Sequence, residues 1–551
     1  MRVAVVGAGP SGLMTFKYLL AACDFLATDP ESVGGTFAHR TYEDGELVSS
    51  KQLTTFSGFR LRVSDPDFLS TDRYVQYLSG YCTHFGLWKH IKLSTTVLSI
   101  RQRGNRSTHI ITYQHRGSPQ TQEYECDAVA ICSGLHVTPN IPNIKGMAQF
   151  KERSQFGVGK TVLILGSGET AMDLGYFAMQ CPTKRVLMSH RDGFLCAPKR
   201  VPDPVILPIL GNKPDPNRLN VPIDSSSASL FDTAYVHRRL RDHMLLWHYY
   251  DVFIKSTLWL VGGSKYGMAH WVGGISDKRY HASKIFFSKS NKAIPYLSAL
   301  YRQERESSFI QRIRSSLIQV PVADTHGRHI GMAPWPSHVD EHGVVHFQNN
   351  GRPECHLLKN DKVKPDMVIF ATGYTQTFPF LPGNYPTSET LDTRSTWHSS
   401  DLSTGFIGFG ANHESYAYQL AIDMGAAPGF WEVLFRDGGW YKLPLLWALG
   451  ANFNAKFRIG GPWKWEGAEE VLVEELWDTV ARRGGFFGRV TLSGLPMAMF
   501  GSINLVLWVL DPVIKVCEMV VSSQDLHTWV CLRTVEMGRT AEPLSHKPLN
   551  P

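Results

Sequence analysis

Two glycine motifs, about 160 residues apart, constrain what this chain can fold into. The first is Gly7-Ala8-Gly9-Pro10-Ser11-Gly12, and the second is Gly166-Ser167-Gly168-Glu169-Thr170-Ala171. Each follows a short run of β-branched residues and opens a stretch with a helical pattern. In such a strand–turn–helix unit the glycines allow a tight turn, a close approach to pyrophosphate and close helix packing. Two units predict one protein that holds two dinucleotides, which indicates electron transfer between them.

The first unit has the other parts of a dinucleotide site. We expect a strand over residues 3–6, a helix over 11–22 and a second strand near 25–28 that ends at Asp29. A carboxylate at that place can accept hydrogen bonds from ribose hydroxyls. The helix N-terminus would donate its N–H groups to the phosphates. A buried strand over 128–132 then ends at Ser133-Gly134.

The second unit differs in the charge that follows its second strand. The strand over 185–189 ends in His190-Arg191, with no acid at the position that Asp29 takes in the first unit. An acid would repel a 2′-phosphate, whereas an arginine would pair with it. The sequence therefore favours NADP over NAD, with Arg191 as the candidate and Lys199 and Arg200 as alternatives.

The length and the order of the expected elements predict an α/β protein with two Rossmann-like domains. A chain of 551 residues exceeds the size at which one core stops growing. We expect a discontinuous first domain over 1–155 and 335–430, with the second domain inserted at 156–334. A helical insertion is expected over about 225–320. We expect residues 431–551 to form a helical, Trp-rich extension.

Composition excludes several classes of protein. The net charge of +7 is dispersed along the chain, so no nucleic-acid partner is indicated. The nine cysteines form no C-x-x-C pair, which argues against a dithiol reductase and fits a reducing compartment. No G-x-S-x-G serine-hydrolase turn is present, and no metal site is expected. We expect a cytoplasmic protein, or one on the cytosolic face of a membrane such as the endoplasmic reticulum, and not a secreted one.

The C-terminal extension holds an uncharged stretch from Val490 to Leu510, between Arg489 and Asp511. Its length nearly matches the ~20 residues that cross a bilayer. Gly494 and Pro496 weaken that interpretation. A membrane-spanning helix, an interfacial segment and a helix packed on the body stay open as alternatives, as does self-association of the chain.

Further motifs carry a resemblance to a known family. The first glycine loop, Val33-Gly34-Gly35-Thr36-Phe37, the second glycine loop and Val368–Tyr374 occur in the order found in flavin-containing monooxygenases. The stretch 47–57 resembles that family's active-site segment. The resemblance covers about residues 1–430, and the combination with Ala371-Thr372-Gly373-Tyr374 makes it specific.

The resemblance implies cofactors, a reaction and site residues. FAD is expected at the first loop and NADPH at the second; reduced flavin would take up O2 as a flavin hydroperoxide, and a soft nucleophile, an amine nitrogen or a sulfur of a small molecule, would attack it. The expected catalytic residues are Ser49, Ser50 and Tyr374. The expected FAD contacts are Gly7, Gly9, Pro10, Ser11, Gly12, Asp29, Gly35, Thr36, Phe37, Val97, Ser133, Gly134, Thr372 and Gly373. The expected NADP contacts are Gly166, Ser167, Gly168, Glu169, Thr170, Ala171, Ser189 and Arg191.

Two departures from the family pattern leave alternatives open. The linker that should read F-x-G-x-x-x-H lacks its histidine over 150–160, and Val48, Ser49 and Ser50 stand where the family has an asparagine. A serine hydroxyl can donate a hydrogen bond there, but less rigidly than an amide. A Baeyer–Villiger enzyme acting on a ketone, and a degenerate flavoprotein with a scaffold role, are the alternative readings.

Overall fold

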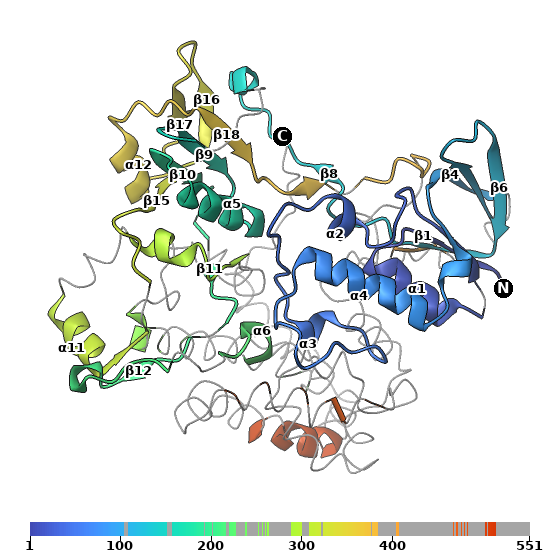
Figure 1. Cartoon of the computed structure of the whole chain (residues 1–551), viewed down its shortest axis with the longest axis horizontal. Coiled ribbons are helices and arrows are strands. Elements are labelled where there is room, and N and C mark those ends of the chain that lie inside the picture. The colour runs from blue at the N-terminus through green and yellow to red at the C-terminus, as the bar shows by residue number, and fades with distance from the viewer. Residues whose placement is uncertain are drawn as a thin grey trace, which may run out of the picture.

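The computed structural model describes most of residues 1–383 (Figure 1). Its gaps within that range are short except over 227–287, where few residues are described, and over 300–307. Beyond residue 383 it describes 404–406, single positions between 467 and 482, and most of 502–513.

A five-stranded parallel sheet carries the first glycine motif. Its strand order is β20-β7-β1-β2-β3, with the N-terminal strand in the centre. Helix α1 joins β1 to β2, so the chain crosses from one parallel strand to its neighbour as a dinucleotide unit requires. The bounds are β1 Val3–Val6, α1 Pro10–Leu19, β2 Cys23–Ala27, β3 Ile91–Lys92, β7 Ala128–Ile131 and β20 Thr404–Phe406.

A four-stranded parallel sheet carries the second motif. Its order is β15-β10-β9-β18, and helix α5 joins β9 to β10 in the way that α1 joins β1 to β2. Figure 1 shows this sheet as a separate unit beside the first. The bounds are β9 Thr161–Leu165, α5 Glu169–Gln180, β10 Arg185–Ser189, β15 Ile330–Ala333 and β18 Met367–Phe370.

The predicted return to the first domain at residue 335 is wrong. Strand β18 pairs with β9 and therefore belongs to the second sheet. The chain rejoins the first unit only beyond β18: β19 (Tyr374–Thr375) pairs with β8 (Thr138–Pro139), and β20 pairs with β7. A strand pattern alone does not say which sheet a strand joins, because both sheets are parallel and buried.

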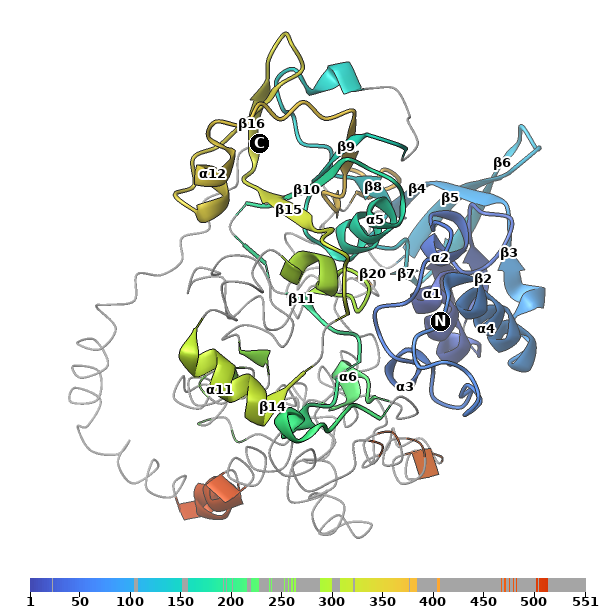
Figure 2. The same cartoon turned by 60° about the vertical axis from the view of Figure 1, so that its left-hand side comes forward.

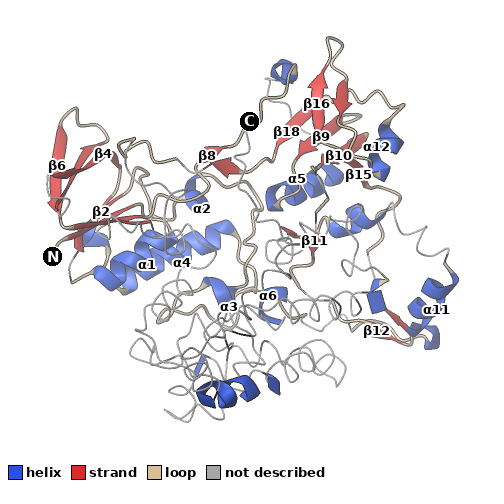
Figure 3. Cartoon of the chain, turned by 180° about the vertical axis from the view of Figure 1, so that it is seen from behind, coloured by secondary structure: helices blue, strands red, loops and turns tan. Residues whose placement is uncertain are grey.

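Apolar residues pack on both faces of the first sheet. Helices α1 and α4 (Thr71–His84) lie side by side on one face (Figure 2). Phe16 of α1 and Leu78 and Tyr81 of α4 are fully buried there. An antiparallel meander covers the other face and buries Phe25 and Ile111. Figure 3 shows the meander at the end of the molecule remote from the second sheet. Its strands are β4 Thr95–Arg103, β5 Thr108–His115 and β6 Thr121–Cys126.

Short elements fill the connections. The pairs β11–β13 and β12–β14 and the helices α6 and α11 follow the second glycine unit, and β16–β17 and α12 cover its far side. The bounds are α2 Thr36–His39, α3 Lys51–Thr54, η1 Trp88–His90, η2 Met147–Phe150, β11 Cys196–Ala197, β12 Val205–Ile206, η3 Pro208–Leu210, α6 Ile223–Ser226, β13 Ser288–Lys289, α11 Phe309–Leu317, β14 Ile318–Gln319, β16 Pro336–Val339, β17 Val345–Phe347 and α12 Pro353–Leu358.

Two predicted features lie largely outside the described residues. These are the helical insertion over 225–320 and the Trp-rich extension over 431–551, including most of the uncharged stretch 490–510. Among the residues that the structure does describe, no helix is both long and apolar enough to cross a bilayer.

Candidate dinucleotide sites and active-site segment

The two glycine motifs fold into the same turn. Gly7 has φ of 108° and Gly166 has φ of 117°, a region that glycine alone adopts without strain. A Cβ on Gly7 would lie 2.4 Å from the carbonyl oxygen of Cys132, and one on Gly166 would lie 2.2 Å from that of Ala371. Each first glycine therefore lets the loop pass against the end of the neighbouring strand, β7 or β18.

The N-termini of α1 and α5 are both open to an anion. Their N-caps, Gly9 and Gly168, have nearly identical backbone angles (φ −78°, ψ −176° and φ −80°, ψ −176°), and no side chain caps either helix. The first N–H groups of a helix need acceptors, and the helix dipole favours a negative one. The residues present therefore fit a pyrophosphate at each helix.

The second loop of the first unit lies directly against the glycine turn. The amide of Gly34 donates to the carbonyl of Ala8 at 2.9 Å. A Cβ on Gly35 would lie 3.2 Å from the Cα of Gly9, so only small residues allow this approach. Phe37 packs edge-on against Tyr74, which fixes the start of α2.

The other predicted FAD contacts surround the carboxyl edge of the first sheet. Asp29 is exposed beyond β2 and accepts a hydrogen bond from Thr96, next to Val97 in β4. The Ser133 hydroxyl is buried after β7 with no partner in the described structure, and Gly134 follows with φ of 89°. An unpaired buried hydroxyl at a strand end fits a bound cofactor group. Pro10, Ser11 and Gly12 form the first turn of α1, and Thr36 begins α2.

The predicted NADP contacts occupy the start of α5 and the end of β10. The Glu169 carboxylate accepts the amide N–H of Lys289 at 2.8 Å, and the carbonyl of Ser167 accepts the Ser288 hydroxyl at 2.8 Å. Burial raises the pKa of Glu169 to about 7, which the hydrogen bond and charge of Lys289 partly oppose. Thr170 is exposed and Ala171 is fully buried, as the close helix packing requires.

The end of β10 presents Arg191 at the surface. Its guanidinium lies over the face of the Trp335 ring, 5.0 Å from the centroid, in a cation–π contact. His190 beneath it is buried against Glu354 at 3.1 Å and accepts the amide N–H of Gly193. The predicted NADP contact Ser189 is fully buried and its hydroxyl donates to the carbonyl of Pro334, so it ties β10 to the segment after β15.

The predicted catalytic serines lie together at the start of α3. Ser49 accepts a hydrogen bond from the Thr54 hydroxyl at 2.9 Å. Ser50 is fully buried, and its hydroxyl has no partner in the described structure. The Ser50 amide donates to Asp224 of α6 at 2.7 Å. This acid comes from the part of the chain inserted after β10, and no local pattern indicates that it reaches the segment.

Thr372, Gly373 and Tyr374 lie beyond the end of β18, next to the second glycine loop. The carbonyl of Gly373 accepts the amide N–H of Asn140, and Thr372 donates to the carbonyl of the same residue. Tyr374 is exposed by 43% and contacts the ring of His136. These contacts form the crossing between the two sheets.

Two side-chain contacts that the sequence did not predict join the two units. The hydroxyl of Tyr42 donates to Asp173 of α5 at 2.6 Å, and Lys199 contacts Glu46 at 2.6 Å. Burial and the bond to Asp173 raise the pKa of Tyr42. These contacts place α5, and with it the second anion site, against the segment that leads to Ser49 and Ser50.

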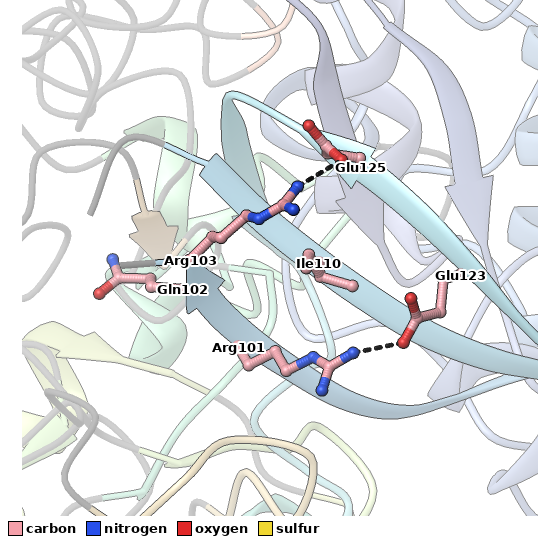
Figure 4. A pocket seen from close by; sticks show the side chains of 6 residues that line it. All are labelled: Arg101, Gln102, Arg103, Ile110, Glu123 and Glu125. Atoms are coloured by element: carbon pink, nitrogen blue, oxygen red, sulfur yellow. Dashed lines mark hydrogen bonds and ion pairs between the residues drawn. The ribbon is translucent and has the colours of Figure 1, made fainter. Parts of the chain in front are cut away.

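A surface depression of about 650 Å³ lies on the meander, away from this region. Figure 4 shows Arg101 and Arg103 reaching from β4 to Glu123 and Glu125 of β6 across it. None of the predicted site residues lines it, so it has no part in the candidate site.

Comparison with known proteins decides the family. A family model described as flavin-binding monooxygenase-like matches residues 1–203. Monooxygenase cfoE of Aspergillus candidus is 43% identical, over 94% of this chain and 99% of its own length. The chain belongs to the flavin-containing monooxygenase family. Monooxygenase ptmN of Penicillium ochrochloron is 39% identical over 93% of this chain and 95% of its own, and flavin-containing monooxygenase 2 of Homo sapiens is 23% identical over 86% and 91%.

Membership agrees with the geometry of the two loops. This flavin-containing monooxygenase is an oxidoreductase that uses FAD and NADPH. The two uncapped helices and their matching glycine turns fit one pyrophosphate each.

Proposed function

We propose that the protein oxygenates a nitrogen or sulfur atom of a small organic substrate, with NADPH as reductant and O2 as oxygen source. FAD, when bound, supplies the transfer of electrons from NADPH to O2. The protein's own residues must hold both dinucleotides, orient the substrate and exclude water. Gly9 and α1 would hold FAD, Gly168 and α5 would hold NADPH, and Arg191 on Trp335 would pair with the 2′-phosphate.

The observation that favours a soft nucleophile is that the cationic side chains near Ser49 and Ser50 are already bonded to other groups. Oxygen insertion beside a ketone builds negative charge on the carbonyl oxygen, which calls for a cationic or N–H donor aimed at it. Among the described residues near this segment, Lys51 is held by three backbone carbonyls, Lys199 by Glu46 and Arg60 by Glu475. Lys289 donates to the carbonyl of Val48 at 3.2 Å, and Arg482 contacts Asp67. An amine or a sulfide needs no such donor, because it attacks as a neutral nucleophile.

The serine hydroxyls would act as hydrogen-bond donors in this site. Ser50 is held in place through its backbone by Asp224, so its hydroxyl hydrogen is available to a cofactor or substrate atom. Ser49 is oriented by Thr54. The Asp224 carboxylate is bonded to the backbone amide of Ser50 and not to its hydroxyl, which fits a reaction in which the substrate brings its own lone pair.

A panel of candidate substrates tests the proposal. Purified, FAD-loaded protein should consume NADPH and O2 faster in the presence of tertiary amines or thioethers, with N-oxides or S-oxides as products. Faster turnover with cyclic ketones, and products that hydrolyse as esters, would support the Baeyer–Villiger alternative. A colourless protein that cannot be loaded with FAD would support the scaffold alternative.

A further inference from the structure

We propose that Asp67 is the centre of a buried junction by which the C-terminal part of the chain holds the active-site segment in position. The junction, named here the Asp67 junction, consists of Asp67 with Gln52, Arg200 and Arg482. It assigns Arg482 as a positioning residue for Ser49 and Ser50. The geometric part stands by itself, and only its catalytic consequence rests on the proposed function.

Three segments that are distant in sequence meet at the Asp67 carboxylate. Its side chain is 7% exposed and accepts two contacts from Nη1 of Arg482, at 2.9 and 3.0 Å. Gln52 of α3 donates to it at 3.1 Å. The Nε of Arg200, from the segment after β11, lies 3.6 Å from Oδ2 of Asp67. The junction therefore connects α3, the second dinucleotide unit and the C-terminal part of the chain.

A second ion pair runs beside the first. Arg60 contacts both oxygens of Glu475, at 2.9 and 2.5 Å, and donates to the carbonyls of Thr55 and Gln52. Thr479 accepts a hydrogen bond from Gln52 at 3.2 Å. Residues 475, 479 and 482 follow the spacing of one helix face. Glu475, Thr479 and Arg482 thus contact α3 and the loop that follows it.

The junction reaches the serines through Lys51. The Lys51 amide donates to the Asp67 carbonyl at 2.6 Å, and its ammonium donates to the carbonyls of Arg62, Val63 and Asp65. Lys51 is buried and follows Ser50 directly. The loop 62–67 is therefore wrapped around the first residue of α3, so a shift of Asp67 moves the start of α3.

Loss of Arg482 would leave the buried Asp67 carboxylate without its nearest counter-ion. Arg200 is farther from the carboxylate, and Gln52 carries no charge, so neither replaces an arginine whose Nη1 contacts both carboxylate oxygens. The carboxylate would then recruit water or turn outward. Either response loosens α3 beside Ser50 and admits water to a site whose chemistry requires its exclusion.

The experiment compares Arg482→Met with wild type and with Arg101→Met, a control that removes an arginine ion pair on the remote meander. Hydrogen exchange of peptides covering 47–67 should become about tenfold faster or more in Arg482→Met and stay unchanged in the control. In FAD-loaded protein, hydrogen peroxide released per NADPH should rise several-fold with FAD content unchanged. Arg482→Lys should show both changes to a smaller extent than Arg482→Met.

A charge exchange keeps the proposal testable if Arg482→Met fails to fold. Arg60→Glu and Glu475→Arg should each speed exchange over 47–67, and the double variant should be slower than either single one. Hydrogen exchange over 47–67 that is unchanged in Arg482→Met would overturn the junction. So would a double variant whose exchange equals the sum of the effects of the two single variants. Changed exchange in a protein with no NADPH oxidation would leave the junction standing and refute the proposed function instead.

Discussion

Replacing Gly168 by alanine separates the second dinucleotide site from the first. Gly168 is the N-cap of α5, its φ of −80° suits any residue, and no heavy atom lies within 4 Å of an added Cβ. The fold should therefore accept the methyl group. A bound pyrophosphate should not, because the methyl group projects where the backbone must approach the phosphate oxygens.

The size of the effect follows from the hydrogen bonds that the methyl group displaces. A hydrogen bond to a charged group contributes about 1.5–3 kcal/mol, and each 1.4 kcal/mol is a factor of ten. Loss of one such bond should weaken NADPH binding about 10- to 150-fold. FAD content and the thermal unfolding of the protein should stay at the wild-type values.

The assay is anaerobic reduction of bound FAD at increasing NADPH concentration. Gly9→Ala is the matched variant, since its Cβ would lie 3.9 Å from the nearest atom, the Cα of Gly35. It should lower FAD affinity and leave the NADPH dependence of the FAD-loaded fraction unchanged. The reasoning is refuted if Gly168→Ala binds NADPH like wild type, or if it loses FAD instead.

Three further changes test separate parts of the site. Arg191→Ala should raise the Michaelis constant for NADPH more than that for NADH, because only NADPH carries the 2′-phosphate; equal effects would remove Arg191 from that role. Burial raises the pKa of Glu169 from 4.5 to about 7, so its neutral form is favoured in the folded protein and its contribution to stability is lost as pH rises through 7. Glu169→Gln should therefore gain thermal stability relative to wild type as pH rises from 4.5 to about 7, and a constant difference over that range would contradict the burial argument. Tyr42→Phe removes the bond to Asp173 between the two units and should slow FAD reduction by NADPH while sparing FAD content; an unchanged reduction rate would show that the bond does not set their distance.

Sequence alone predicted the parts of the fold that depend on local geometry. The turns at Gly7 and Gly166 need glycine because the adjacent strand leaves no room for a Cβ, and this requirement is visible in the chain itself. The strands and the helices that flank them were predicted within a few residues, because buried β-branched runs have a clear pattern.

The parts that sequence did not predict depend on contacts between distant segments. The pairing of β18 with β9 was not predicted, since a buried strand could have joined either sheet. Asp67 and Arg482 are 415 residues apart, and Tyr42 and Asp173 are 131 apart. No periodicity or motif joins such residues, so the arrangement around Ser49 and Ser50 had to come from the structure.

The central claim is that this chain holds FAD and NADPH at the same time, at two separate helix N-termini. Its most direct measurement is the stoichiometry of both cofactors in the protein, determined by absorbance for FAD and by anaerobic titration for NADPH. We expect one FAD per chain, fully reduced by one equivalent of NADPH. A protein that binds only one of the two, or in which NADPH displaces FAD, would contradict it.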